Sequence, residues 1–434
     1  MPIPGFRFIK RKFLEFNTQR LIPDLNKSQW WSYEQLLHFQ GKRLKQIITY
    51  AYRNIPGYQR KFKIIGITPS DIQNLDDLKK IPITTREELQ DNSDYINKSL
   101  VAESLYTGGS TGTTLHYYEC FHGQEMRQHA HQRGWCWNGY HHGKDTLAIV
   151  ASAQGIVSGK NVLNLYGDLT SENLQQNINL LLKHKPRFLR GYVSSLFILA
   201  KYCIDHSIAI DFIQSINPIS ENLYDFQRQL MEQAFQCQVF EEYVCNDGGA
   251  CAWECSGHNG LHYTMERSII ECIDGDMVVT DLWNRAMPFI RYKNGDSVSF
   301  IEDKCSCGRE LPLMKVKGRA NDIIISPRGP ISPSFLIHHG CGMVGPDKKR
   351  ASFRSGIHSV QYVQKPGYNL EINVVKNPWC TVEELNQFRN NVQDLVGDMR
   401  ISLTEVEAIP ATSKGKRHFI INQDTGLLKQ WGFN

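Results

Sequence analysis

The pattern of hydrophobic residues in this 434-residue chain changes near residue 318. Before that point helical and strand-like segments alternate, which favours an α/β or mixed α+β architecture with a substantial sheet. After it, two strand-like segments flank a turn at 365–369, and a capped amphipathic helix over 381–397 and a strand over 401–409 follow. We therefore predict a large N-terminal domain over residues 1–317 and a small C-terminal α+β domain over residues 318–434.

Within the larger domain the sequence predicts helices over most of residues 1–100, with Thr84 or Thr85 as the cap of one helix start. A further helix is expected over about 124–137. Strands are expected at three places: 146–152, 274–283 and 288–292, the last of them ended by a turn at Lys-Asn-Gly-Asp (293–296).

Composition narrows the class of protein. Apolar residues make up 41% and charged residues 21%, and the net charge of 49 − 44 = +5 is spread along the chain. This spread disfavours nucleic-acid binding, and no apolar run approaches the roughly 20 residues of a membrane span. Residues 6–16 suit a basic amphipathic helix that either packs on the domain or touches a membrane. Twelve cysteines without a secretory signal indicate a cytoplasmic protein with reduced thiols.

A loop rich in glycine and hydroxyl side chains lies between residues 107 and 114. Glycine allows positive φ, so that consecutive amide groups can face one concavity and hold phosphate oxygens. No lysine follows the last glycine, so the loop is not a Walker A motif. Taken alone, it is equally consistent with a flexible turn. The candidate phosphate-binding residues are Thr107, Gly108, Gly109, Ser110, Thr111, Gly112 and Thr113.

This loop resembles the phosphate-binding motif of the adenylate-forming superfamily, the acyl-CoA synthetases and their relatives, with Thr114 where a proline is usual. Residues 240–249 are similar to the family's Y-G-x-x-E segment. The resemblance implies that Tyr243 lies beside the adenine and that Asp247 contributes to Mg²⁺ binding. Val244 replaces the motif's glycine, and Asp247 its glutamate. A carboxylate suits a hard cation.

The segments Thr280-Asp281-Leu282 and Pro288 to Asp296 closely resemble the phenylacetate–coenzyme A ligase branch, and imply that Asp296 binds the ribose hydroxyls. Residues 318–324 look like the family's hinge, in which Arg319 would contact the nucleotide. Asn321 stands there where an aspartate is common.

Near the end, Ser413-Lys414-Gly415-Lys416 matches the family's Gly-Lys, whose lysine reaches the α-phosphate and the substrate carboxylate. By motif position the catalytic residue is Lys416, with Lys414 as the alternative. The implied reaction condenses ATP and a carboxylic acid into an acyl-adenylate. The small domain then rotates, removes Lys416 and opens the site to an acceptor.

Cys255, His262, Cys305 and Cys307 form a second constellation. Three thiolates and one imidazole make a closed tetrahedral Zn²⁺ set, and Cys-x-Cys-Gly is typical of a metal knuckle. Relatives of the phenylacetate–coenzyme A ligases show the same pattern. We expect a structural zinc ion; the alternative is unrelated thiols and a core histidine.

The motifs together identify the chain as a member of the adenylate-forming superfamily, resembling the phenylacetate–coenzyme A ligase family and its members in capsular-polysaccharide biosynthesis. The resemblance implies a ligase using ATP, Mg²⁺ and a carboxylic acid, with coenzyme A as the default acceptor. An amide-forming ligase with an amine acceptor is one alternative. A non-catalytic nucleotide-binding relative is the other, and the departures Thr114, Val244 and Asn321 would fit it.

Overall fold

The computed structural model describes residues 22–90, 92–107, 115–150, 161–167, 169–317, 323–337, 356–409, 418–431 and 433. Contacts divide the chain into two units. Unit 1 comprises Met1–Thr107, Leu115–His141 and Glu242–Lys317; unit 2 comprises Gly108–Thr114, His142–Glu241 and Gly318–Asn434. The predicted mixed α/β class is confirmed. The division into domains of 1–317 and 318–434 stays a prediction.

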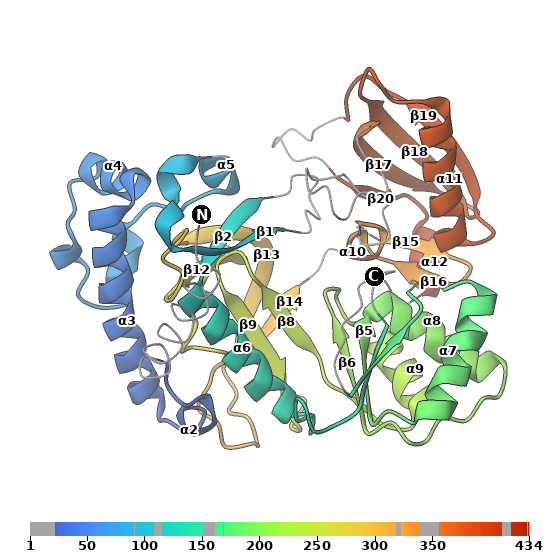
Figure 1. The fold of residues 1–434 in the computed structure, drawn as a ribbon, viewed down its shortest axis with the longest axis horizontal. Helices are drawn as coiled ribbons and strands as arrows, with labels where there is room; N and C mark the ends of the chain where they lie inside the picture. Colours follow the sequence, from blue (N-terminus) through green and yellow to red (C-terminus); the bar gives the residue numbers. More distant parts are fainter. Residues whose placement is uncertain are drawn as a thin grey trace, which may run out of the picture. The chain divides into compact units, whose positions relative to one another are not determined.

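The N-terminal part of unit 1 is helical, as expected (Figure 1), and polar side chains cap several of its helix starts. Ser32 and Gln35 form a reciprocal capping box at the start of α3, and Thr85 caps the short helix α5 by accepting a hydrogen bond from the Glu88 amide. The helices of unit 1 are α2 (Leu25–Ser28), α3 (Tyr33–Asn54), α4 (Pro56–Ile64), α5 (Arg86–Leu89) and α6 (Phe121–Cys136), with 3-10 turns η1 (Pro69–Asp71), η2 (Asp76–Lys80), η3 (Ser93–Tyr95) and η4 (Lys98–Leu100).

Unit 1 also holds a seven-stranded antiparallel sheet and a two-stranded pair that flanks the glycine-rich loop. The order in the large sheet is β11-β12-β13-β14-β10-β9-β8, and the pair is β1-β2. The strands are β1 (Val101–Tyr106), β2 (His116–Cys120), β8 (Glu242–Cys245), β9 (Ala250–Glu254), β10 (Leu261–Tyr263), β11 (Ser268–Ile273), β12 (Asp276–Asp281), β13 (Tyr292–Ile301) and β14 (Leu313–Lys317).

One expected strand of unit 1 is wrong. Residues 288–291 are not a strand, and β13 begins at Tyr292 and runs through the Lys-Asn-Gly-Asp segment that was expected to end it. Arg291 has a left-handed backbone with φ 47°, which breaks the extended chain just before Tyr292. The segment 293–296 therefore lies within the sheet.

Unit 2 contains a five-stranded parallel sheet of order β4-β3-β5-β6-β7, with one helix in each connection from β4 through β5 and β6 to β7. The strand expected at 146–152 is confirmed as β3, as far as residue 150. Its elements are β3 (Leu147–Val150), β4 (Val162–Leu165), α7 (Ser171–His184), β5 (Phe188–Tyr192), α8 (Val193–Asp205), β6 (Ser215–Ile219), α9 (Asp225–Phe235) and β7 (Gln238–Val239).

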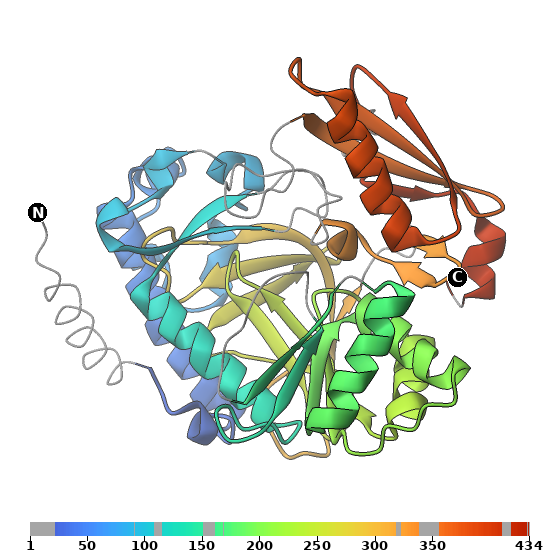
Figure 2. The same cartoon turned by 45° about the vertical axis from the view of Figure 1, so that its right-hand side comes forward.

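The C-terminal part of unit 2 confirms the predicted hairpin, helix and strand. β17 and β18 pair antiparallel across the expected turn, Thr381 and Glu384 cap α11, and apolar side chains of α11 pack against the four-stranded sheet β19-β18-β17-β20 (Figure 2). The elements are β15 (Ile324–Ser326), β16 (Gly329–Ile331), α10 (Pro333–Leu336), β17 (Ile357–Lys365), β18 (Asn369–Lys376), α11 (Val382–Val396), β19 (Arg400–Glu405), β20 (Ile420–Asn422) and α12 (Thr425–Gln430).

Across the described ranges, no helix is both long and apolar enough to cross a membrane. The basic segment 6–16 lies outside the described residues.

Candidate functional site

The predicted site residues divide into those that the structure describes and those that it does not. Gly108, Gly109, Ser110, Thr111, Gly112, Thr113, Arg319 and Lys416 lie outside the described residues, as do the departures Thr114 and Asn321. Thr107 is described. Its amide donates to the Leu115 carbonyl at 3.0 Å, and its hydroxyl accepts from the Leu115 amide at 2.8 Å. These bonds close the base of the glycine-rich loop.

Tyr243 and Asp296 meet in unit 1, as the ribose and adenine assignments require. The Tyr243 hydroxyl donates to Asp296 Oδ2 at 2.6 Å, and the Asn294 side-chain amide donates to the Tyr243 hydroxyl at 3.0 Å. Burial raises the pKa of Tyr243 well above its ordinary value, and the Asp296 charge adds to the effect. The phenol therefore stays protonated and holds the carboxylate in place.

Asp247 lies beside this pair on the turn after β8. Its Oδ2 accepts from the Tyr292 hydroxyl at 3.0 Å, and its Oδ1 accepts from the Cys245 thiol at 3.0 Å. The Arg86 guanidinium lies 3.6 Å from Oδ2. Burial raises the pKa of Asp247 above its ordinary value, and Arg86 opposes that shift. A carboxylate is the kind of ligand that Mg²⁺ takes, and Arg86 lies where it would compete with such an ion for Asp247.

We call Tyr243, Asp247, Asn294 and Asp296 the nucleotide cluster. Asn294 was not predicted as a site residue, because its motif position carries no assigned role. Arg86, in the first turn of α5, was not predicted either. Arg86 reaches the nucleotide cluster across more than 150 residues of chain, and nothing local in the sequence signals that approach.

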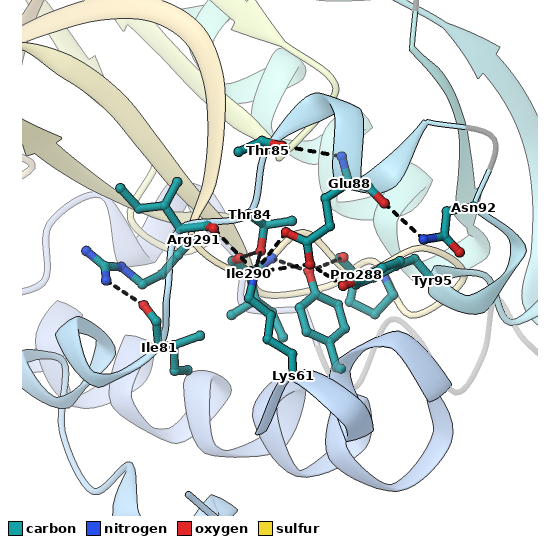
Figure 3. Close-up of polar contacts among 12 residues, drawn as sticks. Lys61, Ile81, Thr84, Thr85, Glu88, Asn92, Tyr95, Pro288, Ile290 and Arg291 are labelled. Carbon is teal, nitrogen blue, oxygen red and sulfur yellow. Dashed lines mark hydrogen bonds and ion pairs between the residues drawn. The ribbon is translucent and has the colours of Figure 1, made fainter. Parts of the chain in front are cut away.

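A buried polar network places α5 against the start of β13 (Figure 3). The Thr84 amide donates to the Arg291 carbonyl at 2.8 Å, and the Thr84 hydroxyl donates to the Ile290 carbonyl at 2.8 Å. The Lys61 ammonium bonds to the Thr84 hydroxyl at 2.9 Å and pairs with Glu88 at 3.0 Å. This network carries Arg86, two residues beyond Thr84, to Asp247.

Cys255, His262, Cys305 and Cys307 come together as predicted, and we call them the metal cluster. Their ligand atoms all lie within 4.8 Å of one another. The closest approaches are 3.4 Å between the sulfurs of Cys255 and Cys305, and 3.3 Å between Cys307 Sγ and His262 Nε2. A tetrahedral zinc ion with bonds of about 2.3 Å to sulfur sets ligand atoms about 3.8 Å apart, so the cluster has the dimensions of such a site.

The surroundings of His262 prepare it as a metal ligand. Its Nδ1 lies 2.8 Å from the Leu311 carbonyl, which fixes the tautomer with Nε2 facing the thiols. Burial lowers the pKa of His262 to about 4, so the ring is neutral and its lone pair is available at neutral pH. Gly257 leaves the space that the ligands need, since a Cβ there would lie 2.9 Å from Cys305 Sγ. The donor set fits a structural zinc ion.

Comparison with known proteins tests the family resemblance. No family model matches the chain. Over 89% of each chain it is 23% identical to Protein CapK of Staphylococcus aureus. It is also 23% identical to the phenylacetate–coenzyme A ligase of Aromatoleum evansii, over 92% of this chain and 97% of that protein. The chain is a distant relative of the phenylacetate–coenzyme A ligases.

Solved structures confirm the fold of this phenylacetate–coenzyme A ligase relative. It matches 2-hydroxyisobutyryl-CoA ligase in complex with 2-HIB-AMP and CoA with a TM-score of 0.65, at 19% identity, over 93% of this chain and 94% of that one. The same ligase in the postadenylation state with R3-HIB-AMP gives a TM-score of 0.60 at 18% identity, over 93% of both chains. The chain has the fold of the adenylate-forming ligases.

Proposed function

We propose that this chain is an adenylate-forming ligase, which activates a carboxylic acid with ATP and passes the acyl group to coenzyme A. The observation that carries the proposal is the nucleotide cluster. It brings the motif residues Tyr243 and Asp296 into direct hydrogen-bond contact, with Asp247 beside them. The relation to phenylacetate–coenzyme A ligases over nearly the whole chain supports the same reaction class.

Three residues of the cluster would contact the nucleotide or its cation. Asp296 accepts hydrogen bonds from the ribose hydroxyls, and Tyr243 lies beside the adenine. Asp247 would hold Mg²⁺, which when bound neutralises phosphate charge. The loop closed by Thr107 would hold the phosphates through its amides, and Arg319 would pair with the nucleotide. These groups orient two mutually repelling anions, which supplies most of what the reaction needs from a protein.

Lys416 would carry the chemical step. Its ammonium would lie between the α-phosphate and the substrate carboxylate, where negative charge develops as the carboxylate oxygen attacks phosphorus and pyrophosphate leaves. Rotation of the small domain would then remove this lysine and admit the acceptor. The complex of 2-hydroxyisobutyryl-CoA ligase with CoA supports coenzyme A as that acceptor. Similarity to Protein CapK is the observation behind a proposed place in polysaccharide biosynthesis.

Carboxylate-dependent exchange of pyrophosphate into ATP, measured over a panel of aromatic, aliphatic and sugar acids, tests the proposal. Lys416→Ala should lower the exchange by about 100-fold or more while ATP still binds. The matched control is Lys414→Ala, which removes the neighbouring lysine of the same motif and should retain most of the exchange. Full exchange in Lys416→Ala, or failure of the wild type to bind ATP, would contradict the proposal.

We also propose that the metal cluster binds one structural Zn²⁺. All four ligand positions are supplied by the protein, so no position is open for catalysis. Metal analysis of the purified protein should find about one equivalent of zinc, since the site's affinity is high when the ligands are preassembled. A folded sample without bound metal, and without metal uptake from added zinc, would overturn this assignment.

A further inference from the structure

The segment that carries Asp296 is a bulge in the sheet. On β12, one residue separates Asp276 from Val278; on β13, three residues separate their partners Ser297 and Lys293. Asn294, Gly295 and Asp296 therefore stand opposite Met277 alone. Bulges of this kind re-aim side chains and recur beside active sites. Gly295 has φ 96°, a conformation that other residues adopt only with strain, so the bulge depends on glycine here.

Asn294 closes this bulge with its side chain. Its Oδ1 accepts from the Asp296 backbone amide at 3.0 Å, and its Nδ2 donates to the Tyr243 hydroxyl at 3.0 Å. Only 5% of Asn294 is exposed, so water competes weakly for these bonds. The side chain thus holds both members of the predicted ribose and adenine pair at once.

The direction of these bonds matters for the carboxylate. A tyrosine hydroxyl has one hydrogen to donate. Because Asn294 donates to the oxygen of Tyr243, the tyrosine hydrogen is left to point at Asp296 Oδ2, 2.6 Å away. The order is therefore Asn294 to Tyr243 to Asp296. These two hydrogen bonds orient Asp296, and its remaining acceptor positions are left for ligand hydroxyls.

We infer that Asn294 is a positioning residue for ribose recognition, acting through Asp296 and Tyr243. The inference rests on the proposed function, because it assumes that Asp296 binds the ribose. Asn294 lies outside the motif positions with an assigned role. Its side chain shapes the bulge and sets the direction of the hydrogen bonds. Asn294 itself makes no contact with the nucleotide in this scheme.

The test compares ATP with 2′,3′-dideoxy-ATP, which lacks both ribose hydroxyls. Binding is measured by titration calorimetry with Mg²⁺ present. Asn294→Ala should weaken ATP binding about tenfold and dideoxy-ATP binding less than twofold, the size expected for one misdirected hydrogen bond. Asn294→Thr offers a single hydroxyl oxygen in place of the separate amide oxygen and nitrogen that contact the Asp296 amide and Tyr243, so it should lie between. In the Asp296→Ala background, Asn294→Ala should have no further effect on ATP.

The matched control is Asn177→Ala. Asn177 is fully buried and also makes two hydrogen bonds, both to the Tyr166 backbone, on a helix of unit 2. Its loss should lower the melting temperature without changing the ratio of the two affinities. Equal weakening of both nucleotides by Asn294→Ala and Asn294→Thr, or additivity with Asp296→Ala, would overturn the inference. Wild-type protein that binds both nucleotides equally would instead count against ribose recognition by Asp296, and so against the proposed function.

Discussion

The metal cluster and the nucleotide cluster lie on the same seven-stranded sheet of unit 1, yet their side chains are arranged in opposite ways. In the metal cluster four donors converge on one point, within 4.8 Å of one another. In the nucleotide cluster hydroxyl and amide donors hold two carboxylates, with Tyr292 and Arg86 on Asp247 and Tyr243 on Asp296. The metal cluster supplies all four ligands of one metal ion from the protein, whereas the nucleotide cluster presents two carboxylates that a ligand can contact.

This difference separates stability from binding. Thiolates and imidazole that converge on a metal tie distant chain segments together, so losing one should loosen the fold. Buried carboxylates cost free energy in the protein without a ligand, so removing one should spare the fold or stabilise it. Substitutions in the metal cluster should therefore lower stability, and substitutions in the nucleotide cluster should lower the affinity for ATP.

The largest effect should follow from Cys255→Ala. Removal of one thiolate should abolish stoichiometric zinc binding and lower the melting temperature by about 10 °C or more, because metal binding contributes directly to folding. Metal analysis and thermal unfolding measure both. Cys272→Ala, at an exposed thiol outside the metal cluster, should change neither. If Cys255→Ala kept both its zinc and its melting temperature, the metal cluster would not be a zinc site that stabilises the fold.

Asp296→Ala should have the converse effect. It removes the proposed acceptor of the ribose hydroxyls, and the loss of two hydrogen bonds to a charged group should weaken ATP binding by about 100-fold. The melting temperature should change by less than about 2 °C, since Asp296 is partly exposed and its removal leaves the core intact. Calorimetric ATP titration and thermal unfolding of the same sample give both numbers. A large loss of stability in Asp296→Ala with little loss of ATP affinity would mean that Asp296 supports the fold and does not bind the nucleotide.

The two clusters also differ in how far the sequence predicts them. The metal cluster follows from residue type, because thiol and imidazole side chains in a Cys-x-Cys-Gly pattern have few other uses. Its four residues meet as expected. The nucleotide cluster was predicted only through its family motifs. Asn294 escaped notice because its role depends on a bulge, and the bulge depends on how β12 pairs with β13.

The fold shows the same division between local and non-local causes. Capped helices such as α11 and the hairpin of β17 and β18 were predictable, since their signals lie within a few residues. The strand expected at 288–292 was wrong, because the left-handed turn at Arg291 is stabilised by partners far away in the chain. Among them are Ile81, whose carbonyl accepts from the Arg291 guanidinium at 2.6 Å, and Glu271, 2.9 Å from its Nε. The sequence of residues 288–292 alone could not predict these partners, because they lie in distant parts of the chain.

Tyr243→Phe should have a smaller effect than Asp296→Ala. The ring remains beside the adenine, but Asp296 loses the hydroxyl that donates to it at 2.6 Å. We expect ATP binding to weaken about tenfold, as one hydrogen bond to a charged group would require. The loss should be smaller for dideoxy-ATP, and Tyr50→Phe, at another hydrogen-bonded tyrosine of unit 1, should leave both affinities unchanged. Equal losses for the two nucleotides would indicate that the hydroxyl acts on packing instead.

The smallest effect is a pH dependence that belongs to Asp247. Burial raises the pKa of Asp247 in the folded protein above its unfolded value. A carboxyl group with a raised folded pKa contributes stability below its unfolded pKa, and that contribution is lost as pH rises through the folded pKa. The melting temperature of Asp247→Asn, measured without Mg²⁺ from about pH 4 to pH 8, should therefore rise relative to wild type as pH increases.

Mg²⁺ binding should depend on the ionised form of Asp247, and so it should become stronger as pH rises. Binding of a hard cation requires the ionised carboxylate, so Mg²⁺ should strengthen ATP binding more in wild type as pH rises, and this gain should be flat in Asp247→Asn. ATP titrates equally in both proteins, so the difference between the two curves isolates Asp247. Parallel curves in both experiments would mean that Asp247 is not the cation ligand. Within the nucleotide cluster, only the Asp296 carboxylate would then serve a ligand, and the contrast with the metal cluster would rest on ribose recognition.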